Sequence, residues 1–261
     1  LSKDGTFNPR DIFGSHDDSD HVYNTPRAWY MARCLNPSTM NWDGPDADFT
    51  PLSDDIPWCM VPEKKVTIED VKYVLSSHFQ GTPYDPYASY GDKSMKGAYR
   101  AIGVNRTDFL GIIQMRPDAG EDSRAIEWVA FASNVFNTAA PFYTDVEKVP
   151  EYFSNTTGDA STDNFYWASR MIAAMADASY SKSIFHIERY QERVMSKGHE
   201  YINQYDELLE KESNAEKRMQ LRQEANEKIA DMVKKETQDT LNKVLYELSN
   251  QMKNAYSRSD A

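Results

Sequence analysis

Cysteine is scarce in this sequence, which has only Cys34 and Cys59 among its 261 residues. Two cysteines exclude a small fold that several disulfides hold together. Both have apolar neighbours, Cys34 within an expected helix and Cys59 in the run Ile-Pro-Trp-Cys-Met. We therefore predict that both thiols are small buried apolar groups.

Long apolar runs and a surplus of positive charge are also missing. No stretch approaches the ~20 apolar residues that a membrane-spanning helix needs, and we see no charged-then-apolar leader. Acidic residues outnumber basic ones, 41 to 29, and the formal net charge is −12. This charge argues against nucleic acid and anionic membranes as partners. We expect a soluble protein and assign it to the cytoplasm.

The segment Gly14–Pro37 is the part around which we organise the rest of the chain. It starts as a polar loop, and its second part has the pattern of a short amphipathic helix. Thr25 is the predicted N-cap, because its hydroxyl can accept from a free amide of the first turn. Pro26 suits the first helical position, where its missing N–H costs nothing. Asn36 precedes a proline, which pushes it out of the α region and predicts the end of the helix.

Arg27 is the unusual residue of this predicted helix. A cation at a helix N-terminus lies against the positive end of the macrodipole, so local energetics do not favour it. We therefore expect an anion, or a developing oxyanion, near its guanidinium. The alternative is a structural salt bridge to Asp17, Asp18 or Asp20.

The run His16–His21 holds two imidazoles and three carboxylates, which are plausible metal ligands. It lacks the spacing and the glycine of a calcium loop. We favour a hydrogen-bonding loop beside a cleft over a metal site, and we expect neither a metal nor a cofactor. The nucleophile elbow, the phosphate loop and the zinc-protease motif are all absent from the sequence.

A second helix is predicted after the capping box that Thr67 and Asp70 form. Its apolar positions continue at helical spacing to Phe79, and Gly81 is expected to end it. His78 shares the apolar stripe of this helix. We interpret it as a satisfied core histidine, with a ligand or a general base as the alternative.

Two apolar runs, Phe109–Met115 and Ala125–Ser133, flank a turn rich in Pro, Asp and Gly and predict an antiparallel hairpin. In the second run only Glu127 interrupts two apolar faces, so we expect a sheet that is covered on both sides. A third strand is predicted over Asn137–Tyr143, either stopped by Pro141 or placed at an edge by it.

The C-terminal part is predicted to be helical from Asp163 onward. A second helix of this part is expected from about Ile184 to Ser196. After Gly198 the sequence contains no glycine or proline, and its apolar residues recur with a period near 3.6. This pattern predicts a helical hairpin, or a pair of long helices, against the core or another subunit.

A series of short segments stands out by its residue types and its order. They are Ser15–Asp20, Tyr23–Tyr30, Leu35–Pro37, Ile56–Trp58, Tyr73–Thr82, Tyr84–Tyr87, Tyr99–Arg100, Asn105–Thr107, Ser161–Asp163 and Phe165–Ala168. Together they resemble the C69 dipeptidases, formerly called U34, which are bacterial N-terminal-nucleophile hydrolases with secernins as more distant relatives. The resemblance runs from about residue 3 to about residue 205 and covers the C-terminal half or so of such an enzyme. The nucleophile of the family, a cysteine at the mature N-terminus, has no counterpart here.

The resemblance implies an α+β fold in which residues 1–205 form part of a four-layer αββα sandwich. Residues 206–261 would then be a helical C-terminal extension. The implied reaction is hydrolysis of the peptide bond of small peptides, with the terminal cysteine as nucleophile and its own α-amine as base. Because neither Cys34 nor Cys59 is at a chain start, we expect this chain alone to be inactive.

The resemblance also implies roles for residues of the Gly14–Pro37 segment. In the related penicillin V and bile-salt acylases, an arginine after a Ser-rich loop lies against the nucleophile, and Arg27 is similarly placed. It would lower the pKa of the thiol or stabilise the oxyanion. Asn24 would donate to a substrate carbonyl, with His16 and Asp18 as further substrate-binding candidates.

The implied partners are a small peptide substrate, the N-terminal half of the same enzyme and further copies in a homo-oligomer. Two other interpretations stay open. An amidase of the same fold could act on a non-peptide amide, which no feature of the chain excludes. A non-catalytic binding or assembly module would account for the missing nucleophile and the long helical tail.

Overall fold

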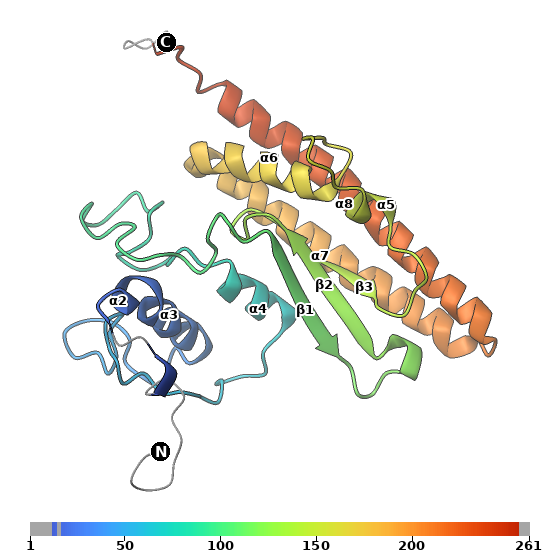
Figure 1. Cartoon of the computed structure of the whole chain (residues 1–261), viewed down its shortest axis with the longest axis horizontal. Coiled ribbons are helices and arrows are strands. Elements are labelled where there is room, and N and C mark those ends of the chain that lie inside the picture. Colours follow the sequence, from blue (N-terminus) through green and yellow to red (C-terminus); the bar gives the residue numbers. More distant parts are fainter. Residues whose placement is uncertain (1–11, 15–16, 256–261) are drawn as a thin grey trace, which may run out of the picture. The chain divides into compact units, whose positions relative to one another are not determined.

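The computed structural model describes residues 12–14 and 17–255. It divides into two compact units, with the boundary between Val104 and Asn105. The first unit contains short helices and long loops, and the second contains a small antiparallel sheet with helices (Figure 1). This mixed architecture agrees with the α+β prediction. The predicted boundary at residue 205 lies inside a long helix, and the division into a domain and an extension stays a prediction.

The first unit has three described helices, α2 (Asp20–Tyr23), α3 (Thr25–Leu35) and α4 (Ile68–Leu75). The prediction that Thr25 caps α3 is wrong, because Thr25 is the first helical residue and Asn24 is the N-cap. The Asn24 backbone is itself helical. Its amide donates to the Asp20 carbonyl at 2.9 Å, so α2 leads directly into α3. The predicted end is confirmed, since Asn36 is the C-cap.

Helix α4 begins as predicted and ends earlier. The Thr67–Asp70 capping box is present in full, but the helix stops at Leu75 instead of continuing to Gly81. The reason lies at Phe79, which is fully buried and has a left-handed φ of 65°. The Ser77 hydroxyl accepts from the Phe79 amide at 3.0 Å and thereby supports this turn. Core packing and local hydrogen bonds thus override the helical pattern.

Aromatic side chains form the core of the first unit. The buried cluster comprises Trp29, Tyr30, Trp42, Ile56 and Phe79. Both indoles bond to the loops that surround α3, with Trp29 Nε1 donating to the Phe49 carbonyl at 3.1 Å and Trp42 Nε1 to the Asn36 carbonyl at 2.7 Å. These bonds anchor long loops that have few backbone hydrogen bonds of their own.

The second unit contains a three-stranded antiparallel sheet in the order β1–β2–β3. Its strands are β1 (Phe109–Met115), β2 (Ala125–Phe131) and β3 (Ala140–Tyr143). The predicted hairpin is confirmed, and Phe109 pairs with Phe131 at its open end. Strand β2 ends before Ser133, because Ala132 has a φ of 66°. Pro141 lies in the edge strand β3, where a residue without an N–H is tolerated.

One sheet face packs against a long helix, and the other is open along β1. On the packed face Trp128 is buried and its ring lies 4.6 Å from that of His199. On the other face Phe109, Ile113 and Met115 are 56%, 69% and 62% exposed. We call this row of β1 side chains, together with Gly111, the β1 outer face. At β2 and β3 this second face is covered, because Phe131 and Phe142 contact Phe153. The expectation of a sheet covered on both sides is therefore met except along β1.

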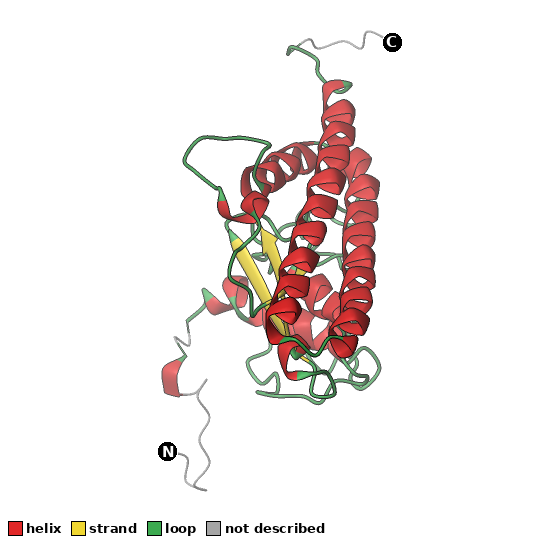
Figure 2. Cartoon of the chain, turned by 90° about the vertical axis from the view of Figure 1, so that its right-hand side faces the viewer, coloured by secondary structure: helices red, strands yellow, loops and turns green. Residues whose placement is uncertain are grey.

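Helices make up most of the second unit. They are the 3-10 turn η1 (Glu121–Ser123), α5 (Glu151–Ser154), α6 (Phe165–Ala178), α7 (Tyr180–Lys211) and α8 (Ala215–Ser249). Figure 2 shows the helices in front of the strands. The pair of long helices is confirmed, although α7 is much longer than the predicted Ile184–Ser196. No helix in the described part of the chain is long and apolar enough to cross a membrane.

Gly198 lies inside α7, where sequence patterns disfavour glycine. A Cβ added at this position would lie 2.6 Å from Cδ and 2.8 Å from Cγ of Pro141 on β3. The glycine therefore lets α7 approach the edge strand closely, and the helix continues through it.

We expect Gly198→Ala to destabilise the protein by about 1–3 kcal/mol, because the new methyl group overpacks this contact. The expected sign is opposite to that of helix propensity, which favours alanine by about 1 kcal/mol. Urea unfolding measures the change, with the exposed Ser196→Ala on the same helix as the control. A stabilised Gly198→Ala variant would show that the contact is loose.

Candidate functional site

The start of α3 positions the Arg27 side chain. Its Nε donates to the carbonyl of Arg100 at 3.2 Å, and the Arg100 amide donates to the Val22 carbonyl of α2 at 3.0 Å. The guanidinium of Arg27 is thus half-buried between a helix start and a distant loop segment. Burial lowers the pKa of Arg27, and the positive charge of Arg100 lowers that pKa further.

The acidic residues of the preceding loop do not neutralise Arg27. Within residues 12–14 and 17–255 no carboxylate lies within 4.0 Å of its guanidinium, so the alternative of a salt bridge to Asp17, Asp18 or Asp20 is not formed. Asp17 instead accepts from the Ser19 amide at 2.9 Å. Asp20 accepts from the Asn24 side chain at 2.5 Å. Arg27 therefore combines a helix start and a neighbouring cation with the lack of a compensating carboxylate among the residues that the structure describes.

The other predicted site residues lie at or near the same loop. Asn24 is at the α2–α3 junction, and its amide group is bonded to Asp20. Asp18 is exposed, and His16 lies outside the described residues. His21, at the end of the same run, bonds to Asp54 through Nε2 at 2.9 Å. In the part of the chain that the structure describes, no three His, Cys, Asp or Glu side chains come together as metal ligands would.

His78 is buried and paired with a carboxylate that the sequence analysis did not single out. Its Nδ1 lies 2.9 Å from Asp85 Oδ1, which also accepts from the Tyr87 amide at 2.9 Å. The His78 and Tyr87 rings meet edge to face, with centroids 5.1 Å apart. These contacts agree with the interpretation of His78 as a satisfied core histidine. His78 comes just after Leu75, the last residue of α4. Its spacing from the apolar residues of α4 is helical, which is why the sequence pattern predicted it to lie within the helix.

Lys72 is a second buried charge that the sequence analysis did not single out. It lies on α4, is 4% exposed, and donates to the Ser76 hydroxyl at 2.6 Å. Burial lowers the pKa of Lys72 to about 7. A lysine at an apolar helix position in a sequence is the signal that could have indicated it.

We expect Lys72 to make stability depend on pH. Between about pH 7 and pH 10.4, the usual lysine value, the unfolded chain binds a proton that the folded chain does not. Stability therefore rises with pH across this window, and the cost of the buried charge is fully present below it. Lys72→Met should stabilise the protein at pH 6.5 by on the order of 3 kcal/mol and much less at pH 10.

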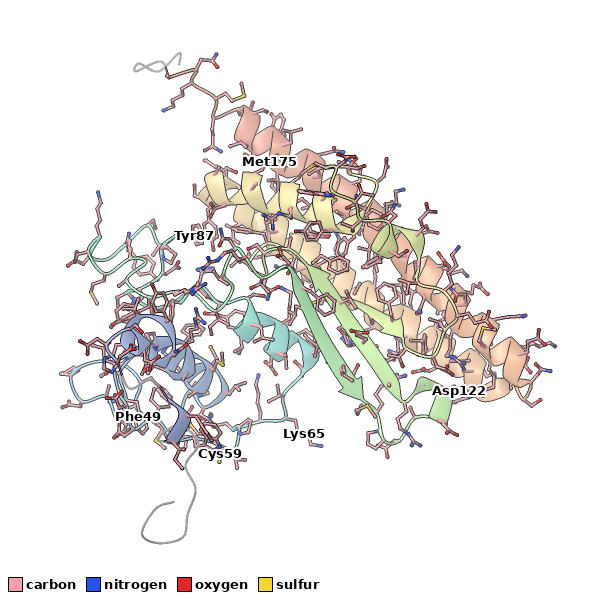
Figure 3. The ribbon with its side chains drawn as sticks, in the orientation of Figure 1. Phe49, Cys59, Lys65, Tyr87, Asp122 and Met175 are labelled. Carbon is pink, nitrogen blue, oxygen red and sulfur yellow. The ribbon has the colours of Figure 1, made fainter. Side chains whose placement is uncertain are left out.

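Urea unfolding at both pH values tests this expectation. The exposed Lys65, labelled in Figure 3, provides the control variant Lys65→Met, which should change stability little at either pH. An equal effect of Lys72→Met at both pH values would show that the Lys72 amine keeps its ordinary pKa.

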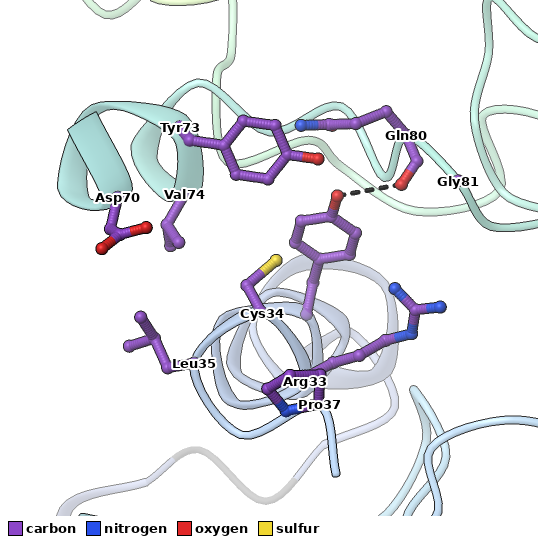
Figure 4. Close-up of a pocket in the computed structure, with 10 residues that line it drawn as sticks. Arg33, Cys34, Leu35, Pro37, Asp70, Tyr73, Val74, Gln80 and Gly81 are labelled. Carbon is purple, nitrogen blue, oxygen red and sulfur yellow. Dashed lines mark hydrogen bonds between the residues drawn. The ribbon is translucent and has the colours of Figure 1, made fainter. Parts of the chain in front are cut away.

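The two cysteines lie in different surroundings. Cys34 is half-buried and lines a pocket of about 400 Å³ in the first unit, together with Tyr30, Tyr73 and Val74. Figure 4 shows its thiol on the side of α3 that faces Tyr73 and Val74. The Tyr30 hydroxyl donates to the Gln80 carbonyl at 2.9 Å. Burial raises the pKa of the Cys34 thiol, which disfavours the thiolate that a nucleophile needs.

The prediction that Cys59 is buried is wrong. Cys59 is exposed, and Figure 3 labels it on a loop of the first unit. The neighbouring Trp58 is 62% exposed and Val61 is 89% exposed. The run around Cys59 is therefore split: Ile56 lies in the core of the first unit and Met60 packs against it, whereas Trp58 and Cys59 face outward. Both cysteines are free thiols.

Comparisons with known proteins match this chain over most of its length. The sequence model of peptidase family C69 matches residues 1–193. A dipeptidase of Bifidobacterium longum is 45% identical over 291 aligned positions, which cover 97% of this chain and 55% of the relative. A probable dipeptidase A of Streptococcus pyogenes is 45% identical over 254 residues, covering 97% of this chain and 51% of the relative. Dipeptidase A of Lactobacillus helveticus is 32% identical over 241 residues, which cover 92% of this chain and 49% of the relative. The chain thus spans about half the length of these curated relatives.

Proposed function

Because the chain belongs to peptidase family C69, we propose that it is part of a peptide hydrolase that acts on dipeptides. The dipeptidase names of its relatives support this substrate class. We use the term complete enzyme for this chain together with the remaining length that those relatives have. The activity proposed below is that of the complete enzyme.

The proposed nucleophile is a cysteine at the mature N-terminus of the complete enzyme, outside this chain. Its thiolate attacks the scissile carbonyl carbon while its own α-amine takes up the thiol proton. Collapse of the tetrahedral intermediate releases the C-terminal amino acid as its nitrogen accepts a proton. Water then hydrolyses the thioester and releases the N-terminal amino acid. Cys34 is a poor alternative, because burial raises the pKa of its thiol.

Arg27 is the residue that this chain is proposed to contribute to catalysis. Its guanidinium is half-buried and has no carboxylate partner among the described residues. A positive charge in such a place stabilises a thiolate or the oxyanion that develops on the scissile carbonyl. The helix start adds a further positive potential. Asn24 and Asp18, at the same loop, stay the proposed contacts to the substrate, as does His16.

The β1 outer face supports the finer fold proposal, an αββα sandwich. Its large apolar side chains Phe109, Ile113 and Met115 are each more than half exposed. Contiguous apolar surface of this kind marks an interaction site. We propose that a second sheet of the complete enzyme stacks on this face, about 10 Å away as sheets do. Assembly into a homo-oligomer and location in the cytoplasm stay predictions.

A hydrolysis assay on a panel of dipeptides and matching non-peptide amides tests the proposed function. The complete enzyme should release amino acids from dipeptides, and the 261-residue chain alone should not. The Cys34→Ala and Cys59→Ala variants of the complete enzyme should keep their activity. Activity on the non-peptide amides alone would indicate an amidase. Turnover by the isolated chain that Cys34→Ala abolishes would replace the terminal cysteine with an internal nucleophile.

A further inference from the structure

Arg100 is held beside Arg27 by contacts from several directions. Its amide donates to the Val22 carbonyl at 3.0 Å, and its own carbonyl accepts from Arg27 Nε at 3.2 Å. Its guanidinium lies over the Tyr23 ring, 5.4 Å from the ring centroid. The position of this second cation is therefore fixed by the same helix junction that fixes Arg27.

The two neighbouring arginines, both partly buried, lack the carboxylate partner that several other arginines of this protein have. Among the described residues the exposed Arg106 and Arg124 also have none within 4.0 Å, so the combination of partial burial with no carboxylate distinguishes Arg27 and Arg100. Arg33, Arg116 and Arg193 each lie within 3.0 Å of an Asp or Glu oxygen. Neither Arg27 nor Arg100 has a carboxylate within 4.0 Å in the described ranges 12–14 and 17–255. The contrast is informative because acidic residues outnumber basic ones in this chain by 41 to 29. The charge of Arg100 also lowers the pKa of Arg27, so the two cations are close enough to repel one another.

Two neighbouring cations with no carboxylate within 4.0 Å in the described part of the chain favour an anionic ligand. We propose that Arg100 binds the free C-terminal carboxylate of the dipeptide while Arg27 faces the scissile carbonyl, an inference that rests on the proposed function. The planar guanidinium suits this ligand, because it can donate two parallel hydrogen bonds to one carboxylate.

The proposal accounts for selection of dipeptides by length. In a dipeptide the carboxylate is carried by the residue that directly follows the scissile bond. Each further residue moves the carboxylate away by about 3.5 Å. A cation next to Arg27, the residue that faces the scissile carbonyl, can therefore bind the C-terminal carboxylate of a dipeptide but not that of a longer peptide.

The test compares a dipeptide with its C-terminal amide in the complete enzyme. The wild-type enzyme should cleave the free acid with a kcat/KM about thirtyfold or more above that of the amide, the effect expected for a hydrogen-bonded charge. Arg100→Gln should lower kcat/KM for the acid by a similar factor and leave that for the amide nearly unchanged. Arg100→Lys should restore part of the preference, since it keeps the charge and loses the fork.

The control is Arg189→Gln, which removes another guanidinium over an aromatic ring, 5.2 Å from the Phe185 centroid. It should leave the preference for the acid intact. If Arg100 had only a structural role, Arg100→Gln would lower kcat/KM for the acid and for the amide equally, together with the melting temperature. That result would overturn the proposal. Equal cleavage of acid and amide by the wild-type enzyme would overturn it while keeping the dipeptidase. If neither substrate were cleaved, the proposed function itself would fail.

Discussion

Arg27→Ala should lower kcat/KM for dipeptides by roughly a hundredfold or more in the complete enzyme, as removal of an oxyanion donor does. The physical reason is the uncompensated charge at the start of α3. The guanidinium has a backbone carbonyl and a second arginine beside it, and no carboxylate among the described residues. Its positive charge is therefore available to a thiolate or to an oxyanion. Steady-state kinetics on a dipeptide measures the effect.

The conservative variant separates a catalytic from a structural role. Arg27→Lys should recover only part of the activity, because an ammonium keeps the charge but cannot reproduce the geometry of the guanidinium. The loss should appear in kcat at a nearly unchanged melting temperature. Near-wild-type kinetics of Arg27→Ala would show that the residue only supports the Arg100 loop.

Ile113→Lys should destabilise the complete enzyme by about 3 kcal/mol or more and abolish its activity, because a second sheet would take the new charge out of water at a cost that pairing with Glu127 does not repay. In the chain described here Ile113 is 69% exposed and lies opposite Glu127 on β2. A lysine at this position would be harmless on an open face, where it would form a favourable cross-strand pair. The effect therefore depends on whether a second sheet covers the β1 outer face.

The neighbouring residue provides the matched control. Ile112 lies on the opposite face of the same strand and is 9% exposed. Ile112→Lys should therefore destabilise the protein whether or not a second sheet is present. Unfolding in urea compares the two variants of the complete enzyme. If Ile113→Lys retained wild-type stability and activity while Ile112→Lys did not, the β1 outer face would be open and the sandwich proposal would be wrong.

Local signals in the sequence predicted several elements correctly. The β1–β2 hairpin follows from apolar runs on either side of a turn, and the capping box marks the start of α4. Both depend on residues close together in the chain. The end of α4 depends instead on Phe79, whose left-handed backbone is supported by burial in an aromatic core. The close approach of α7 to β3 at Gly198 likewise depends on Pro141, which is distant in sequence.

The candidate site could be predicted only in part, because it also depends on contacts between residues that are distant in the sequence. Arg27 could be singled out because a cation at a helix start is locally unfavourable. Its neighbour Arg100 is 73 residues away in the sequence, and no local pattern connects the two. The same holds for the carboxylate partner of His78, since the turn that brings Asp85 back to it replaces the predicted end of a helix. Tertiary contacts, rather than residue types, complete the site.

The central claim is that this chain supplies Arg27 to the active site of a dipeptidase. A crystal structure of the complete enzyme, with its nucleophile replaced and an intact dipeptide bound, tests it most directly. We predict that a nitrogen of the Arg27 guanidinium lies within about 3–4 Å of the scissile carbonyl oxygen or of the nucleophile position. A dipeptide bound elsewhere, or Arg27 paired with a carboxylate of the remaining part of the enzyme, would contradict the account.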